Sequence, residues 1–168
     1  FSAESGAGGT RSFDFDGSSD KVTFGDIALN LSTGATMAFW CEHLDNTNGA
    51  VLGSDDSCCH SYIQPHENGT IYFESSDDSN TATGAMSGTD GFHYYVVSVT
   101  GYTATIYEDG VDITTDSSLS SANVTFNYIG TTGVKWFNGK VAIVHLYNRA
   151  LTAAEIQQNY RTHEGRFG

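Results

Sequence analysis

The sequence lacks basic residues over most of its length. From Val22 to Val134 it contains no Lys or Arg, although the same span holds fourteen carboxylates. Nucleic acids and anionic lipid surfaces are normally bound through clustered Lys and Arg, so we expect neither nucleic acid nor membrane among the partners. The tail from Lys135 onward carries five basic and two acidic residues. This polarity suits a solvated acidic surface, cation binding, or head-to-tail association of copies.

Long apolar runs are also missing. No segment approaches the roughly 18 apolar residues of a membrane-spanning helix, so we expect no membrane insertion. The N-terminus has neither the basic nor the apolar region of a secretory signal peptide. Because the chain begins at Phe1 rather than Met, we expect processing, a fragment or an incomplete upstream sequence.

Proline is scarce, with one residue, whereas glycine is abundant, with nineteen. Together with heavy use of Ser, Thr, Asn and Asp, this composition is typical of short strands joined by tight turns. At 168 residues the chain has the length of a single domain. We therefore predict one all-β domain over residues 1–168, in which residues 1–10 form an extended N-terminal arm.

Alternating apolar residues predict about eleven strands. Residues 37–43 are apolar on both faces, as expected of a central strand covered on both sides. Asp109-Gly110 lies between two alternating runs and predicts a tight hairpin, because both positions tolerate positive φ. We assign the segments at residues 11–16, 21–24, 37–43, 50–53, 61–64, 70–74, 93–99, 103–107, 111–114, 124–130 and 137–147.

One short helix is predicted at the end of the chain. Thr152 suits the N-cap, and Glu155 three residues later has the spacing of a capping box. Leu151, Ile156 and Tyr160 would then face the strands. We expect this helix to pack against an edge or end of the sheets and to be structural.

Cysteine is rare: the chain has Cys41 and the adjacent pair Cys58 and Cys59. An odd number leaves at least one unpaired thiol in a monomer. Two alternatives follow, and the redox compartment decides between them. Cys41 forms a disulfide with Cys58 or Cys59, or the cysteines are free buried thiols.

Four segments taken together resemble the laminin G-like, concanavalin A-like lectin/glucanase jelly-roll family. They are residues 13–22, 37–40, 91–97 with 106–111, and 137–156, in family order along nearly the whole chain. The ending looks particularly like versions in tailed-bacteriophage structural proteins. The resemblance implies a jelly-roll sandwich of two antiparallel sheets, with rim loops that bind glycans or protein.

The same resemblance bears on calcium. Family members often hold a structural Ca²⁺ with an Asp in the last strand, where this chain has Ala142. Loss of a carboxylate removes a hard oxygen ligand, so inheritance of that site is doubtful. The acidic pairs Asp55 with Asp56 and Asp77 with Asp78 are the candidate Ca²⁺ ligands, with solvated turn residues as the alternative. No cofactor is required by the sequence.

Catalysis is not expected. Glycosidases on this type of sandwich carry paired carboxylates on one strand, commonly as Glu-x-Asp-x-x-Glu, and the sequence has no such spacing. Glycan recognition instead uses exposed aromatic side chains. The candidates are Tyr62, Tyr72, Tyr102 and Trp136, whereas Trp40 is expected in the core. Asn30, Asn68 and Asn123 begin N-glycosylation sequons, which matter only in a glycosylating host.

These observations lead to two functional hypotheses. The first is a non-enzymatic structural or adhesion module, exposed on a virion or extracellular assembly as a decoration, tail or filament component. Its partners would be other copies or other structural proteins. The second is a carbohydrate-binding module of a secreted protein, calcium-assisted or not, that binds host or environmental glycans.

Overall fold

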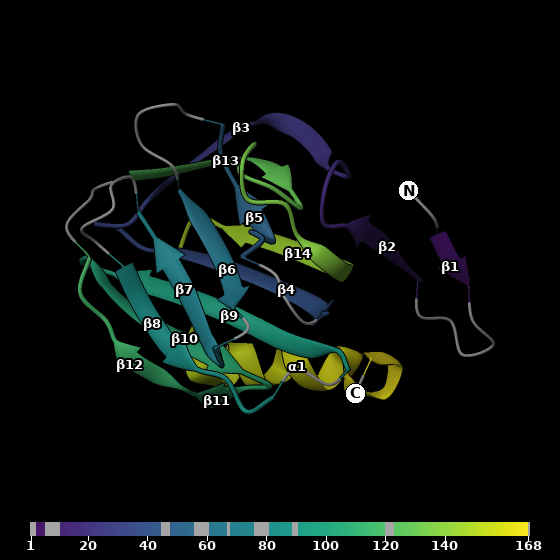
Figure 1. Ribbon diagram of the computed structural model, residues 1–168. Helices are drawn as coiled ribbons and strands as arrows, with labels where there is room; N and C mark the ends of the chain where they lie inside the picture. The colour runs from purple at the N-terminus through teal and green to yellow at the C-terminus, as the bar shows by residue number, and fades with distance from the viewer. Residues whose placement is uncertain are drawn as a thin grey trace.

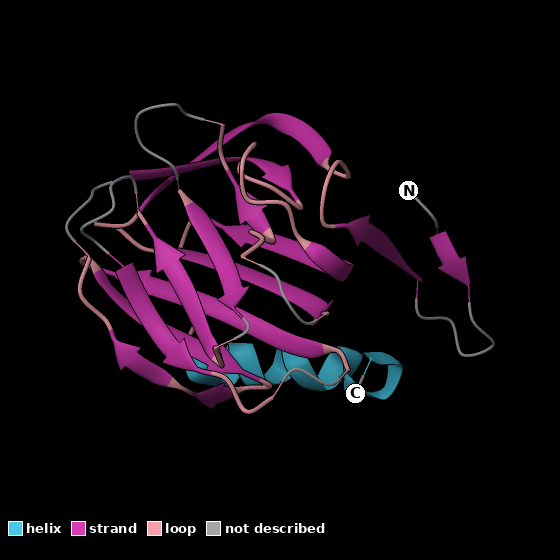
Figure 2. Ribbon diagram, in the orientation of Figure 1, coloured by secondary structure: helices cyan, strands magenta, loops and turns pink. Residues whose placement is uncertain are grey.

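The protein is a sandwich of two antiparallel sheets with one helix, as Figure 1 shows. The computed structural model describes residues 11–44, 48–55, 61–66, 68–75, 81–88, 91–119 and 123–167, and the backbone of residues 3–5. The predicted all-β jelly-roll class with a C-terminal helix is confirmed (Figure 2).

Each sheet has seven strands among the described residues. In spatial order, the first sheet is β1 (Ala3–Ser5), β2 (Arg11–Asp16), β14 (Asn138–Tyr147), β4 (Ala35–His43), β9 (His93–Thr100), β10 (Thr103–Glu108) and β11 (Val111–Asp112). The second sheet is β12 (Thr114–Asp116), β8 (Thr81–Ala85), β7 (Thr70–Glu74), β6 (Tyr62–His66), β5 (Leu52–Gly53), β13 (Asn123–Ile129) and β3 (Val22–Asn30).

The described strands number fourteen, more than the eleven predicted. Two were missed, because β8 is built from small residues without strong alternation and β1 lies in the predicted arm. The predicted strand at residues 111–114 is two strands. At Ile113 the chain passes from β11, paired with β10 in the first sheet, to β12, paired with β8 in the second.

Strand β4 separates two apolar cores. Met37 and Phe39 point between the two sheets, whereas Ala38 and Trp40 point to the opposite face, and all four side chains are fully buried. This alternation follows from the two-residue period of a strand. It confirms the expectation that this strand is covered on both sides.

Helix α1 (Ala153–Phe167) starts with the predicted capping box. The Thr152 amide donates to Glu155 Oε2 at 2.8 Å, and the Glu155 amide donates to Thr152 Oγ1 at 3.3 Å. Arg149 adds two hydrogen bonds to the Glu155 carboxylate, at 2.8 and 3.0 Å. The bonds from Arg149, followed by those from Thr152, lower the pKa of Glu155 to about 2. The cap therefore stays ionised at ordinary pH.

The expectation that the helix packs at an edge or end of the sheets is wrong. It lies across the outer face of the first sheet (Figure 1). Trp40 on β4 stacks on Tyr160 of the helix, with ring centroids 5.7 Å apart and planes at 16°, and contacts Phe167 at 5.2 Å. Ile156 is fully buried in the same cluster. Because large rings project outward from the central strands, the helix is needed over the middle of the sheet.

Two further sequence features can be placed. Asp109 and Gly110 have φ of 51° and 81°, so the predicted tight hairpin is confirmed. None of the described helical segments has the length and apolar character that a membrane crossing requires.

Replacing Ile156 tests the helix-side core. Ile156→Ala should lower the free energy of unfolding by about 2–5 kcal/mol, because it leaves a cavity between the helix and the sheet. Gln158→Ala, at an exposed position of the same helix, should change it by less than about 0.5 kcal/mol. Chemical denaturation measures both values. Equal effects of the two substitutions would contradict this placement of the helix.

Candidate functional site

A tightly bonded loop between β13 and β14, residues 130–137, stands beside the second sheet. The Phe137 amide donates to the Gly130 carbonyl at 2.9 Å and closes the loop. Thr131 and Thr132, both buried, accept hydrogen bonds from the amides of Gly133 and Lys135 through their hydroxyls. These bonds hold the backbone of the loop in place beside the second sheet.

Two glycines let this loop approach closely. A Cβ atom at Gly49 would collide with the backbone of Trp136 and Phe137, and one at Gly53 would collide with the Thr131 carbonyl. The approach also aligns the chain before β5 with the loop, because the Ala50 amide donates to the Lys135 carbonyl at 3.4 Å. Asn48 is thereby brought next to Lys135.

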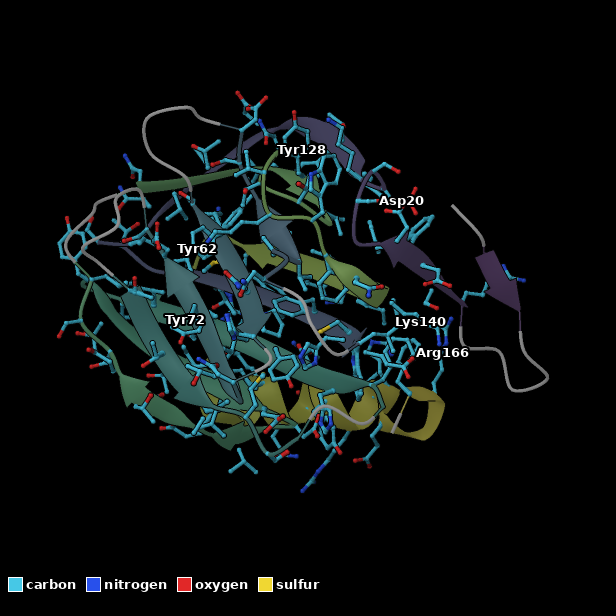
Figure 3. The ribbon with its side chains drawn as sticks, in the orientation of Figure 1. Asp20, Tyr62, Tyr72, Tyr128, Lys140 and Arg166 are labelled. Carbon is cyan, nitrogen blue, oxygen red and sulfur yellow. The ribbon has the colours of Figure 1, made fainter. Side chains whose placement is uncertain are left out.

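The first hollow of the site lies on the outer face of β6 and β7. It has a volume of about 330 Å³ and is lined by Asn48, Tyr62, Gln64, His66, Tyr72 and Lys135. The lining side chains of β6, Tyr62, Gln64 and His66, occupy alternate positions, as expected for one face of a sheet. Figure 3 shows Tyr62 and Tyr72 on these neighbouring strands.

Within the first hollow the two tyrosines differ in exposure. Tyr62 is only 8% exposed; the Lys135 ammonium lies over its ring, 3.9 Å from the centroid, and its hydroxyl donates to Glu74. Tyr72 is half-buried, accepts a hydrogen bond from Asn68 Nδ2 at 2.9 Å and meets the His66 ring edge to face. Tyr72 is therefore the stacking surface that a ligand can reach, and Tyr62 supports Lys135.

The second hollow lies between the loop and the end of β2. Its volume is about 360 Å³, and it is lined by Asp16, Gly17, Asn48, Val134, Lys135, Trp136 and Asn138. Val134 is 73% exposed and Trp136 is half-buried, so the loop tip offers an apolar wall. Asn138 and Asp16 face each other in the pairing of β14 with β2.

Asp16 is already occupied by local donors. Its Oδ1 accepts from the amides of Ser18, Ser19 and Asp20, and its Oδ2 accepts from the hydroxyls of Ser18 and Ser19, at 2.8–3.1 Å. The backbone bonds from Ser19 and Ser18 hold the pKa of this carboxyl far below its usual range. Asp16 is therefore an ionised turn residue at the rim of the second hollow.

The two hollows share a wall made of Asn48 and Lys135. Gln64 joins the two: its Oε1 accepts from Lys135 Nζ at 3.2 Å, and its Nε2 donates to Asn48 Oδ1 at 3.5 Å. Gln64 itself is 3% exposed. We call the two hollows and this wall the paired-hollow site.

Three of the four predicted glycan-binding aromatics come together in this site: Tyr62, Tyr72 and Trp136. Tyr102 does not line either hollow. It lies in the turn between β9 and β10, with φ of 65°, and packs against the core between the sheets. The site also contains Asn48, Gln64, Lys135 and Asn138, which sequence reasoning missed. One signal was available, since Lys135 ends the long span without basic residues and precedes Trp136.

Asp55, one of the four predicted calcium ligands, has protein partners. Its Oδ1 accepts from Asn127 Nδ2 and its Oδ2 from the Tyr128 hydroxyl, both at 2.9 Å. The bond from Asn127, followed by that from Tyr128, lowers the pKa of Asp55. Asp56, Asp77 and Asp78 lie outside the described residues. Among the residues that are described, no three His, Cys, Asp or Glu side chains form a metal-binding group.

The three sequon asparagines, Asn30, Asn68 and Asn123, are all exposed. The Asn68 side chain lies at the edge of the first hollow, because it bonds to Tyr72.

Cys41 is a free thiol, 1% exposed in the core between the sheets. Of the two alternatives for Cys41, the structure has the free buried thiol; Cys58 and Cys59 lie outside the described residues. Ala142 packs against the helix-side core.

Residues 16–157 match the laminin G-type family described as the concanavalin A-like lectin/glucanases superfamily. No curated protein sequence matches the chain. Among solved structures, the chain is similar to a sialidase from Trypanosoma rangeli (12% identity, TM-score 0.62), of which it covers 28% with 92% of its own length.

It is also similar to a pentraxin from Limulus polyphemus (12% identity, TM-score 0.58; 86% of this chain and 78% of that one) and to domains LG4-5 of the mouse laminin α1 chain. The laminin comparison gives 16% identity and a TM-score of 0.59, over 84% of this chain and 44% of that one. At these identities the similarity shows the fold alone.

The hydrogen bonds of Asp55 predict a pH effect. Asn127→Ala should raise the pKa of Asp55 toward its ordinary value, and Tyr128→Phe should raise it less, because Asn127 is the larger cause. A carboxyl with a lowered pKa stabilises the fold above its unfolded pKa, and that stability is lost as pH falls through the folded pKa. The stability lost in Asn127→Ala should therefore shrink in acid.

Carboxyl ¹³C NMR titration measures the pKa, and denaturation at several pH values measures the stability. Asn123→Ala, an exposed amide on the same strand, is the matched control and should leave Asp55 unchanged. An Asp55 titration that is identical in wild type and Asn127→Ala would contradict the assigned hydrogen bonds.

Proposed function

The chain belongs to the concanavalin A-like lectin/glucanases superfamily, and on this basis we propose that it is a carbohydrate-binding or adhesion module that uses the paired-hollow site. The observation that carries the proposal is the position of two reachable aromatic side chains, Tyr72 and Trp136, on either side of Asn48 and Lys135. This is the mixture of apolar surface and a few fixed polar groups that small-molecule sites contain.

The chemistry of the lining fits a sugar. A pyranose ring has an apolar face of C–H groups that stacks on aromatic rings, and hydroxyls around its edge that both donate and accept hydrogen bonds. Tyr72 and Trp136 offer the rings, while Asn48 and Asn138 offer amides with both donors and acceptors. Because these groups stand on strands and on a tightly bonded loop, they are in place before a ligand arrives, which reduces the entropy lost on binding.

We propose binding without catalysis. Glycoside hydrolysis commonly needs two carboxyl groups on opposite sides of the bond that is cut, one of them protonated. Among the described residues that line the site, Asp16 is the one carboxylate, and its lowered pKa keeps it ionised. This supports a lectin-like role, although the sialidase among the similar structures is named for an enzyme.

Calcium is not required by the proposed site, because amides, aromatic rings and an ammonium make up most of its lining. Calcium assistance at Asp55 with Asp56, or at Asp77 with Asp78, stays a prediction from the sequence. The binding experiment below includes a chelator, which separates binding without calcium from binding that calcium assists.

Exposure on an extracellular or virion assembly is the wider setting that we propose. Two arginines of the basic tail support exposure on such an assembly. Arg161 and Arg166 are exposed on α1, outside the first sheet, whereas the paired-hollow site lies at the second sheet. Lys140 and Arg149, however, form ion pairs with Glu42 and Glu155.

Sedimentation across salt concentrations tests charge-driven docking between copies of the chain. Added salt should weaken such docking, because it screens the charges. Assembly that is unchanged by salt would contradict it.

A glycan array tests the main proposal. We expect the wild-type chain to bind a subset of glycans equally with calcium and with EDTA. Tyr72→Ala and Trp136→Ala should each weaken binding about tenfold, because each removes one stacking surface. Tyr102→Ala removes a half-buried tyrosine outside the site and should leave affinity unchanged.

Circular dichroism and thermal unfolding establish that each variant is folded. Tyr72→Phe and Trp136→Phe keep an aromatic ring and should retain most of the affinity. Absence of binding to every glycan, with and without calcium, would overturn the proposed function.

A further inference from the structure

We propose that the paired-hollow site takes an internal stretch of a glycan chain, with one sugar unit in each hollow and the linkage between them lying over Asn48 and Lys135. The inference rests on the proposed carbohydrate binding and goes beyond it by defining the ligand as an oligosaccharide or polysaccharide segment. A single terminal sugar would use only half of the site.

The size of the hollows supports one unit in each. At about 330 and 360 Å³, both lie at the lower end of the volumes of small-molecule sites. Neither is an enclosed cavity; each opens to the surface. A sugar unit bound in either hollow can therefore continue into further units outside it, which a closed pocket for a chain end would prevent.

Each hollow has its own aromatic surface. Tyr72 belongs to the first and Trp136 to the second, and neither residue lines the other hollow. They come from separate parts of the fold, a strand of the second sheet and the loop before β14. Two stacking surfaces with a polar wall between them match two apolar sugar faces joined by a polar linkage.

The wall is built to keep its geometry. Gln64 bonds to Lys135 on one side and to Asn48 on the other, and it is 3% exposed. The Tyr62 ring supports the Lys135 ammonium from below. Both Asn48 and Lys135 line both hollows, so their polar groups serve the oxygens at the junction of two adjacent units.

Calorimetry with oligosaccharides of increasing length tests this inference. The probes are glucose, mannose, galactose and xylose, and their homo-oligosaccharides of two to four units. In the series that binds, we expect the disaccharide or trisaccharide to bind at least about tenfold more tightly than the monosaccharide, because a second ring is stacked. Further units should add less than about threefold, because they pass beyond the two hollows.

Two variants assign the hollows. Tyr72→Ala and Trp136→Ala should each reduce the affinity for the oligosaccharide to near that of the monosaccharide. For the monosaccharide itself, at most one of the two substitutions should matter. Tyr72→Phe and Trp136→Phe, which keep a ring, serve as controls for folding and for the position of the loop.

The outcomes separate the inference from the proposed function. A monosaccharide that binds as tightly as its oligomers, or oligomer binding that depends on only one aromatic residue, overturns the two-unit site but leaves carbohydrate binding standing. Absence of binding in all four series, and to every glycan of the array, overturns both.

Discussion

The site depends on one close approach, that of the loop at residues 130–137 to the chain on either side of β5. Gly49 and Gly53 permit this approach, because a side chain at either position would collide with the loop backbone. The loop in turn carries Lys135 to the second sheet, beside Tyr72 and Gln64, and places Trp136 in the second hollow. Without that contact the polar and aromatic groups would lie on separate elements with no common hollow.

Behind this surface, the fold is organised around a strand that is buried on both faces. The core between the sheets takes one set of β4 side chains, and the cluster under α1 takes the other. The helix thus covers Trp40 and its neighbours on the outer face of the first sheet. This leaves the outer face of β6 and β7, on the second sheet, for binding (Figures 1 and 3).

Much of the fold could be predicted from local patterns. The capping box at Thr152, the Asp109-Gly110 turn and the double apolar face of residues 37–43 each leave a mark within a few residues. Strand β8 left no such mark, because Thr and Ala are compatible with several structures and its pairing with β7 decides the outcome. The packing of the helix over the sheet could not be predicted either, since it depends on which outward rings lie side by side in the folded strands.

The site was predicted in part. Tyr62, Tyr72 and Trp136 could be identified because they are aromatic residues near predicted loops or strand ends. Asn48, Gln64 and Asn138 could not be found in the same way, because amides are frequent in turns and on exposed strands. Lys135 and Asn48 are 87 positions apart in the chain, and only the closed loop brings them together.

The two tryptophans allow the central claim to be tested within one sample. Trp136 lies in the second hollow, whereas Trp40 is fully buried under the helix. In ¹⁵N-labelled protein titrated with the oligosaccharide series, the indole N–H signal of Trp136 should move in proportion to saturation and that of Trp40 should stay in place. A saturating ligand that leaves the Trp136 signal unmoved, or that moves only that of Trp40, would contradict binding at the paired-hollow site.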